Sequence, residues 1–338
     1  NDLDRLEELY LKYQYKNFSI TYGKMELESP LVRLHDGRMK PKVFSGFKAD
    51  YSHHQHHFTT AWFNKASPRS TTHWYTIDEA IGLYNNGVNR EGEPSDYYEN
   101  LTSKGLGVAG YQSTLKSGLH LNLWNYFLEN ISNSTTAMAI WEQDAGLYGG
   151  VSYLYQMPLN LGGCTNRATT FHDPDEQTHM LSTRIGYAFD AFETHLNATH
   201  IFNTGRYLFP REFGVDPSFT YISRSQLEGL GNATSIGIGA HKAIKQIEVN
   251  LDWNYTHTDS DPRFNKYQLA SYNQFNVDCS YRFQDKLEGL HLRLLYVNRI
   301  ATDKTLTLQE QFNAVNFNQI NLIANFSFST SEHKGHFH

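Results

Sequence analysis

Apolar and polar side chains alternate with a period of two residues in many segments of this 338-residue chain. In residues 247–255 the odd positions are apolar or aromatic and the even positions are polar or charged, and residues 275–283 repeat this pattern. Because successive side chains of a β-strand point to opposite faces, the alternation predicts strands with one apolar and one polar face. Charges on the polar face and aromatic residues at the ends of the apolar face are typical of a barrel with lipid outside and water inside.

The composition excludes other classes of protein. Mean hydropathy is −0.56, and no run approaches the ~20 apolar residues of a membrane-spanning helix, which excludes a helical membrane protein. Aromatic residues reach 14%, which fits two interfacial girdles. The net charge of −6 argues against a nucleic-acid partner. Of the two cysteines, Cys164 and Cys279, the second falls on an apolar strand face and is expected to be a small hydrophobic residue rather than half of a disulfide.

Long and short connections alternate between about fifteen strand candidates. The longest connections fall near residues 66–104, 158–177 and 204–232. Tight turns at one end and large loops at the other are typical of outer-membrane barrels. We therefore predict an all-β fold, an antiparallel transmembrane β-barrel of about 14–18 strands. A single domain is expected over residues 1–328, followed by a C-terminal tail over residues 329–338.

Three stretches contain more specific motifs. The first comprises Tyr22-Gly23-Lys24-Met25, Ser29-Pro30-Leu31-Val32, Asp36-Gly37-Arg38-Met39-Lys40-Pro41 and Phe44-Ser45-Gly46-Phe47. The second comprises Phe209-Pro210-Arg211-Glu212-Phe213, Tyr221-Ile222-Ser223-Arg224 and Glu228-Gly229-Leu230-Gly231, and the third is the closing segment 276–328. These stretches resemble the OprD-type outer-membrane porins of Gram-negative bacteria.

The resemblance implies about eighteen antiparallel strands around a narrow, charged pore in the outer membrane. It also implies passive diffusion of small polar or carboxylate-bearing solutes, such as amino acids and short peptides, with no cofactor and no catalysed reaction. The expected partners are outer-membrane lipid and these solutes. Because the chain begins at what would be an interior strand of that family, about three further strands are expected before Asn1.

Two groups of basic residues are candidates for the pore constriction. The loops that resemble the family contain, respectively, Arg33, Arg38, Lys40 and Lys42, and Arg206, Arg211 and Arg224. A ring of guanidinium and ammonium groups lowers the barrier for carboxylates and slows cations. The alternative for each group is a solvated loop with scattered charge.

Charged residues on the polar strand faces are a third set of candidates. A charged side chain at the lipid midplane costs ~2–4 kcal/mol, so these residues are expected to face the lumen. They could contact a solute or pair with one another across the wall. The set comprises Glu248, Asp252, Asp278, Arg282, Arg293 and Arg299.

A metal site and an enzyme are not expected. The cluster His53, His54, His56 and His57 lies at a strand junction with no acidic or thiol ligand within the run, whereas structural metal sites usually have four well-placed ligands. The sequence contains no Gly-x-Ser-x-Gly motif that would place a nucleophilic serine.

Two other interpretations stay open. The long loops could block the lumen, so that the barrel serves as a structural subunit of a larger assembly with other outer-membrane proteins. A soluble all-β binding protein, such as a lectin-like sandwich, has the same two-residue period but buries its apolar faces in a dry core.

Arg38 and Lys40 provide a test of the pore hypothesis. Replacing both with neutral residues removes two positive charges from the proposed constriction, so the reversal potential in a salt gradient should move toward cations. The shift should shrink at 1 M salt, where exposed charges are screened within ~3 Å. An unchanged reversal potential at low salt would identify them as ordinary loop charges.

Overall fold

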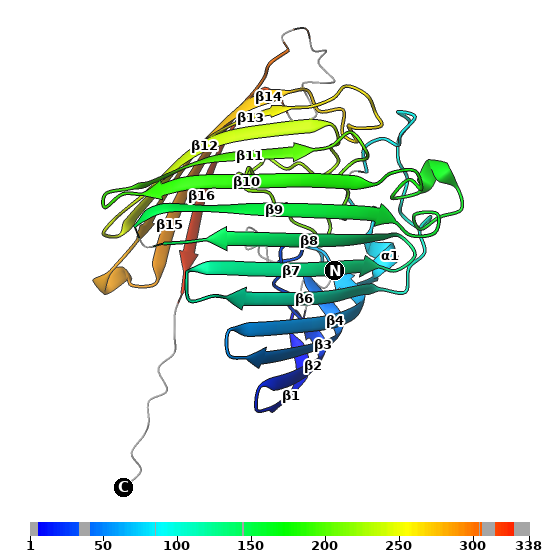
Figure 1. The fold of residues 1–338 in the computed structure, drawn as a ribbon, viewed down its shortest axis with the longest axis horizontal. Coiled ribbons are helices and arrows are strands. Elements are labelled where there is room, and N and C mark those ends of the chain that lie inside the picture. Colours follow the sequence, from blue (N-terminus) through cyan, green and yellow to red (C-terminus); the bar gives the residue numbers. More distant parts are fainter. Residues whose placement is uncertain are drawn as a thin grey trace.

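The computed structural model describes residues 6–33, 41–84, 86–143, 145–303, 305 and 315–327. Its strands form one antiparallel sheet in which neighbours in sequence are neighbours in space (Figure 1). The path comprises β1 (Leu9–Tyr15), β2 (Phe18–Met25), β3 (Val43–His53), β4 (His56–Ser67), β6 (Leu106–Thr114), β7 (Leu119–Leu128), β8 (Ser132–Trp141), β9 (Gly146–Pro158), β10 (Thr178–Ala188), β11 (Glu193–Ile201), β12 (Ala233–Ile244), β13 (Ile247–His257), β14 (Tyr272–Arg282), β15 (Leu290–Ala301) and β16 (Phe317–Phe326). The short strand β5 (Tyr75–Thr76) pairs with β4 and precedes the helix α1 (Ile77–Ala80). No helix in these described ranges is long and apolar enough to cross a membrane.

Short turns join the strands at one end of the sheet, and most of the connections at the other end are long. Two-residue turns place Lys16, His54 and Lys245 in the left-handed region, with φ of 49°, 52° and 55°, which suits tight hairpins. The long connections at the opposite end span residues 26–42, 68–105, 159–177, 202–232, 258–271 and 302–316. The predicted antiparallel fold and its alternation of short and long connections are thus confirmed.

The two faces of the sheet differ as the alternation predicts. On the outward face Leu251, Trp253 and Tyr281 are 43%, 37% and 40% exposed. On the inward face of the same strands Asn254 and Asn276 are only 1% and 2% exposed. Apolar side chains outside and buried amides inside are the arrangement of a membrane barrel and the opposite of a sandwich with a dry apolar core.

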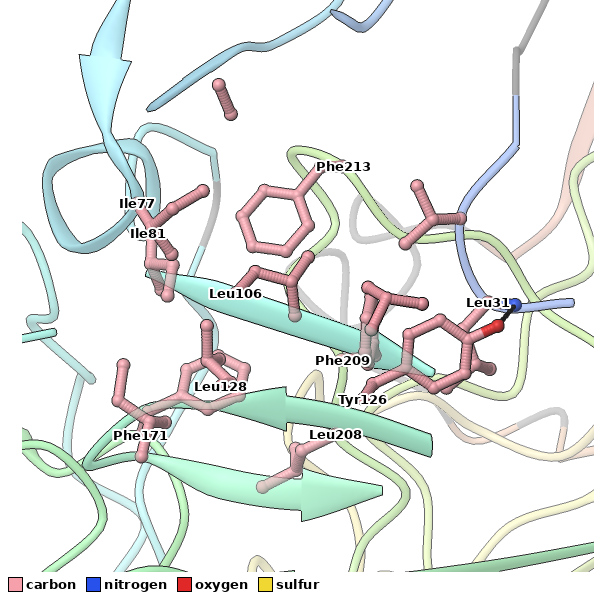
Figure 2. Packing of buried hydrophobic residues seen from close by; sticks show 14 of the residues in the cluster. Leu31, Ile77, Ile81, Leu106, Tyr126, Leu128, Phe171, Leu208, Phe209 and Phe213 are labelled. Atoms are coloured by element: carbon pink, nitrogen blue, oxygen red, sulfur yellow. Dashed lines mark hydrogen bonds between the residues drawn. The ribbon is translucent and has the colours of Figure 1, made fainter. Parts of the chain in front are cut away.

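An apolar cluster fills part of the space on the inner side of the sheet (Figure 2). The wall strands supply Leu106, Tyr126 and Leu128 to it, and the long connections supply side chains that include Leu31, Ile77, Ile81, Phe171, Phe209 and Phe213. The Leu31 amide donates to the Tyr126 hydroxyl at 3.1 Å, and its carbonyl accepts from the Val215 amide at 2.9 Å. The loops therefore pack inward on the wall.

A buried ammonium group joins four of the long connections. Lys266 Nζ lies 3.4 Å from Glu228 Oε1 and about 5 Å from the ring centroids of Tyr97, Phe171 and Tyr267. Burial lowers the pKa of Lys266, but the Glu228 carboxylate and the two tyrosine hydroxyls raise it by more, so the ammonium stays charged. The cation and its aromatic surroundings fix these loops against one another.

Substitution of Lys266 tests this loop contact. Lys266→Met leaves the buried Glu228 carboxylate without its ammonium partner, a change that costs about 3–5 kcal/mol in buried pairs. We expect faster hydrogen exchange at the Val88 amide, which donates to the Lys266 carbonyl at 2.7 Å. The double variant Lys266→Met with Glu228→Gln should recover much of the protection. Equal hydrogen exchange at Val88 in the single variant and the unmodified protein would contradict the role of Lys266 in holding the loops together.

Candidate functional site

A narrow cavity lies where the loop 202–232 approaches Lys42, just before β3, and the loop that follows β4. Its volume is about 20 Å³, which is room for about one water molecule. Lys42 Nζ donates to the Gly214 carbonyl at 2.9 Å across it. The charged residues in its lining are Lys42, Arg69, Arg211, Asp216 and Glu228, and Tyr221 lines it as well.

Lys42 is the cation of this cavity whose charge is most sensitive to its surroundings. Its side chain is buried, and burial together with repulsion from Arg69 and Arg33 lowers its pKa to about 7, against a smaller opposing effect of Glu28. The ammonium group is therefore close to half protonated at neutral pH. The net charge of the narrow cavity changes by one unit over the pH range around neutrality.

Aromatic rings support the two arginines of the narrow cavity. The Arg69 guanidinium lies 5.7 Å from the Tyr84 ring centroid, and that of Arg211 lies 5.0 Å from the Tyr267 centroid. Arg211 Nε is also 3.9 Å from Glu228 Oε2. Contact with a ring face orients a guanidinium and leaves its in-plane N–H groups able to donate to a carboxylate.

The acidic side chains near the narrow cavity bind loop backbone. Asp216 accepts from the Ser218 amide at 2.9 Å, and Glu212 accepts from the amides of Gly82 and Tyr84 at 2.9 and 3.1 Å. Burial raises the pKa of both carboxyl groups against the effect of these hydrogen bonds. Because their oxygens are occupied by amides, the carboxylates hold the loops in place.

A second, wider cavity adjoins the first, and Tyr221 lines both. Its volume is about 220 Å³, and it lies between the loop 202–232 and the inward faces of strands from β10 to β15. Arg184 on β10 lines it with Nε donating to Asn197 at 2.8 Å and Nη2 donating to the Phe219 carbonyl at 3.2 Å. The Phe219 ring lies 5.3 Å from this guanidinium, so Arg184 has a fixed position.

Two carboxylates line the wide cavity, and they differ in their partners. Arg293 Nε donates to both oxygens of Asp278 at 2.8 and 3.0 Å, so this carboxylate is paired across the wall. The closest basic atom to Asp252 is His195 Nε2 at 3.9 Å, and within the described ranges Asp252 accepts no hydrogen bond. Arg184 and Asp252 therefore face one cavity without forming an ion pair with each other.

The remaining predicted residues lie outside these two cavities. Arg206 is buried, with Nε 2.9 Å from Glu176 Oε1, and ties loops together. Arg33 and Arg224 are exposed, and Glu248 and Arg282 form an exposed pair 3.4 Å apart near the short-turn end. Arg299 is buried over the Tyr272 ring at 4.2 Å. Arg38 and Lys40 lie outside the described residues.

Several cavity residues were absent from the sequence-based set of site residues, among them Arg69, Arg184, His195, Tyr221, Asp216 and Glu228. Arg184 and His195 occupy inward positions of strands, so the alternation that identified Asp252 could also have identified them. Arg69 and Tyr221 lie in irregular segments, where no periodicity indicates the direction of a side chain.

The histidine cluster at the β3–β4 turn does not converge on one point. His56 Nδ1 is bonded to the Tyr111 hydroxyl at 2.9 Å, whereas His57 Nδ1 is bonded to the Ser52 hydroxyl at 2.8 Å. These two histidines are adjacent on a strand and so point to opposite faces. In the part of the chain that the structure describes, no three His, Cys, Asp or Glu side chains are arranged to hold a metal ion.

Solved outer-membrane channels of Pseudomonas aeruginosa have the same fold. OpdK, solved with vanillate, is 14% identical with a TM-score of 0.73, and the match covers 94% of this chain and 77% of OpdK. OccK3 (OpdO) is 13% identical with a TM-score of 0.72 and coverages of 94% and 78%. OccK2 (OpdF), solved in complex with glucuronate, is 13% identical with a TM-score of 0.69 and coverages of 94% and 79%.

No protein-family model and no curated protein matches the chain. The likeness is therefore one of fold, and at this level the expected resemblance to OprD-type barrels is confirmed.

Lys42 generates a prediction about pH. Its pKa is lowered to about 7, so the ammonium is charged below that pH and neutral above it. In planar bilayers, preference for anions should therefore decrease as the pH rises through this value. Lys42→Met should show the weaker preference throughout and no change over this range. The role of Lys42 would be contradicted if the ion selectivity of the unmodified protein stayed constant from one pH unit below this pKa to one pH unit above it.

Proposed function

We propose that the chain is an outer-membrane channel of a Gram-negative bacterium through which small polar or carboxylate-bearing solutes diffuse passively. The observation that carries this proposal is the pair of adjoining cavities inside the sheet, a narrow one with Lys42, Arg69 and Arg211 and a wide one with unpaired Arg184 and Asp252. When Lys42 is protonated, the three cations of the narrow cavity outnumber its two carboxylates, Asp216 and Glu228. This balance favours a solute carboxylate, because low-dielectric walls strengthen each charge.

Vanillate and glucuronate, the compounds solved with OpdK and OccK2, both have a carboxylate group. Two of the three cations in the narrow cavity are guanidinium groups, whose planar donors match a carboxylate. These observations support a carboxylate as the part of the solute that the narrow cavity recognises.

The wide cavity favours solutes that have an ammonium group as well. If Arg184 and Asp252 had only a structural role, an ion pair between them would stabilise the fold. Instead, Arg184 donates to Asn197 and to the Phe219 carbonyl, and Asp252 accepts no hydrogen bond within the described ranges. A zwitterion can satisfy both, with its carboxylate on Arg184 and its ammonium on Asp252. Amino acids and short peptides are solutes of this chemistry.

Transport of matched solutes tests the proposal. Proteoliposomes would be given 4-aminobutanoate, butanoate and butylamine, which share a chain length and differ in their charges. We expect the zwitterion to enter fastest, with Asp252→Asn lowering its advantage over butanoate by about tenfold, the equivalent of ~1.4 kcal/mol. Arg184→Gln should instead lower its advantage over butylamine.

Glu248→Gln is the matched control, because Glu248 is an inward carboxylate on β13 that lies outside both cavities. It should leave the order of the three solutes unchanged. Equal permeation of all three solutes through an open channel would overturn the preference for zwitterions but would still support the proposal that the protein is a channel.

A blocked barrel is the second candidate, and the small volume of the narrow cavity, about 20 Å³, favours it. Single-channel recording separates the two. Discrete conductance steps support the channel, whereas no conductance, either in the unmodified protein or after Lys42→Ala, would favour a structural subunit of a larger assembly.

A further inference from the structure

Three histidines face outward at the long-loop end of neighbouring strands. They are His179 on β10, His200 on β11 and His257 on β13. The residues on either side of each in the sequence are buried on the inner side, namely Thr178, Met180, Thr199, Ile201, Thr256 and Thr258. Because a strand alternates its side chains, the three imidazoles lie on the outer face, as do the exposed Leu181 and Phe202.

Strand register brings the three imidazoles into one row. Thr234 on β12 is directly opposite His200 on one side and His257 on the other. Since neighbouring strands are ~4.8 Å apart, the strands of His200 and His257 are about 10 Å apart. On the adjacent strand β10, Leu181 is opposite His200, so His179 is displaced by two residues toward the long loops.

Each imidazole uses the same ring nitrogen to contact a hydroxyl group. His179 Nδ1 is 2.6 Å from the Tyr153 hydroxyl, His200 Nδ1 is 2.9 Å from that of Thr234, and His257 Nδ1 is 3.3 Å from that of Ser271. When the hydroxyl donates to Nδ1, the neutral ring has its proton on Nε2. Within the described ranges no hydrogen bond occupies these three Nε2 atoms, so each is open to a ligand and is a donor in the tautomer that has its proton on Nε2.

The row lies at the boundary of the apolar band. On β10 the outward side chains from Leu181 to Tyr187 are mostly apolar, and His179 precedes them at the long-loop end. The nine residues from His179 to Tyr187 span about 20 Å along the membrane normal at the usual rise and tilt of a barrel strand. That is close to the ~25 Å apolar band of such barrels. His179 thus lies at the edge of the apolar band, and His200 and His257, which are level in register with Leu181, lie about two residues inside it, at the boundary between headgroups and acyl chains.

We propose that His179, His200 and His257 form a binding surface for the phosphorylated headgroups of lipids in the leaflet at the long-loop end of the barrel. A phosphate offers several strong acceptor oxygens, and charge-assisted hydrogen bonds to it are stronger than neutral ones. Three N–H donors spread over neighbouring strands match the lateral extent of a headgroup. This proposal needs only the outward face of the sheet, so it does not depend on whether the lumen conducts.

Lipid retention in native mass spectrometry tests the surface. Three lipids with identical acyl chains isolate the contribution of the phosphate monoester: phosphatidic acid has this group, phosphatidylcholine has a phosphate diester, and diacylglycerol has no phosphate. A phosphorylated glucosamine lipid adds sugar hydroxyls to the phosphate. The full chain should retain phosphatidic acid about tenfold better than diacylglycerol. The triple variant His179→Phe, His200→Phe, His257→Phe should lose this preference, whereas the triple glutamine variant, which keeps an N–H donor at each position, should keep most of it.

Histidines on the inner face are the matched control. His120 and His241 occupy inward positions near the short-turn end, so His120→Gln with His241→Gln should leave lipid retention unchanged. If the phenylalanine variant does not fold, the single variant His257→Phe at the exposed end of the row should still lower the preference about threefold. Equal retention by the unmodified protein and either phenylalanine variant would overturn the proposal, and so would loss of retention in the control.

Discussion

Hydrocarbon offers no hydrogen-bond partner to a peptide group, and the rest of this structure depends on that constraint. Every strand in the path from β1 to β16 pairs with its neighbour in the path, so between the strands of the described residues the backbone polar groups are satisfied within the sheet. Pairing then fixes the side chains, because alternate residues must face outward, and those within the apolar band are mostly apolar. Charges of the spanning strands consequently collect on the inner face, where Arg184, Asp252, Asp278 and Arg293 meet.

A large sheet that curls around water needs something to narrow its interior. Here the long connections do so by burying apolar side chains against the inner wall, with the Leu31 amide bonded to Tyr126 and Phe209 and Phe213 packed nearby. Carboxylates such as Asp216 then bind loop amides. Because the acidic groups are used in this way, the basic groups of the narrow cavity are left with fewer partners of opposite charge.

Much of this arrangement could be predicted from the sequence, and the part that could not has a physical cause. Period-two alternation assigns Leu251 to lipid and Asp252 to the interior, because a strand leaves no other choice. The same rule applies to Arg184. It gives no information on Arg206, whose burial depends on Glu176, thirty residues earlier in the chain. The resemblance indicated which loops enter the interior, but not which of their arginines face open space.

The contact that each arginine makes distinguishes the structural arginines from the arginines that line the cavities. Arg293 and Arg206 direct their N–H groups to carboxylates, which use up the donors and neutralise the charge. Arg69 and Arg184, which line the cavities, lie instead over the rings of Tyr84 and Phe219. Arg211 lies over the Tyr267 ring and is 3.9 Å from Glu228 Oε2, beyond hydrogen-bond distance. A ring face holds a guanidinium in place through its electrons and leaves donors in the plane, so a cation can be fixed without being neutralised. Fixed and incompletely neutralised charge is what a passage needs if solutes are to bind briefly and leave, because tight pairing would hold them and free loops would not orient them.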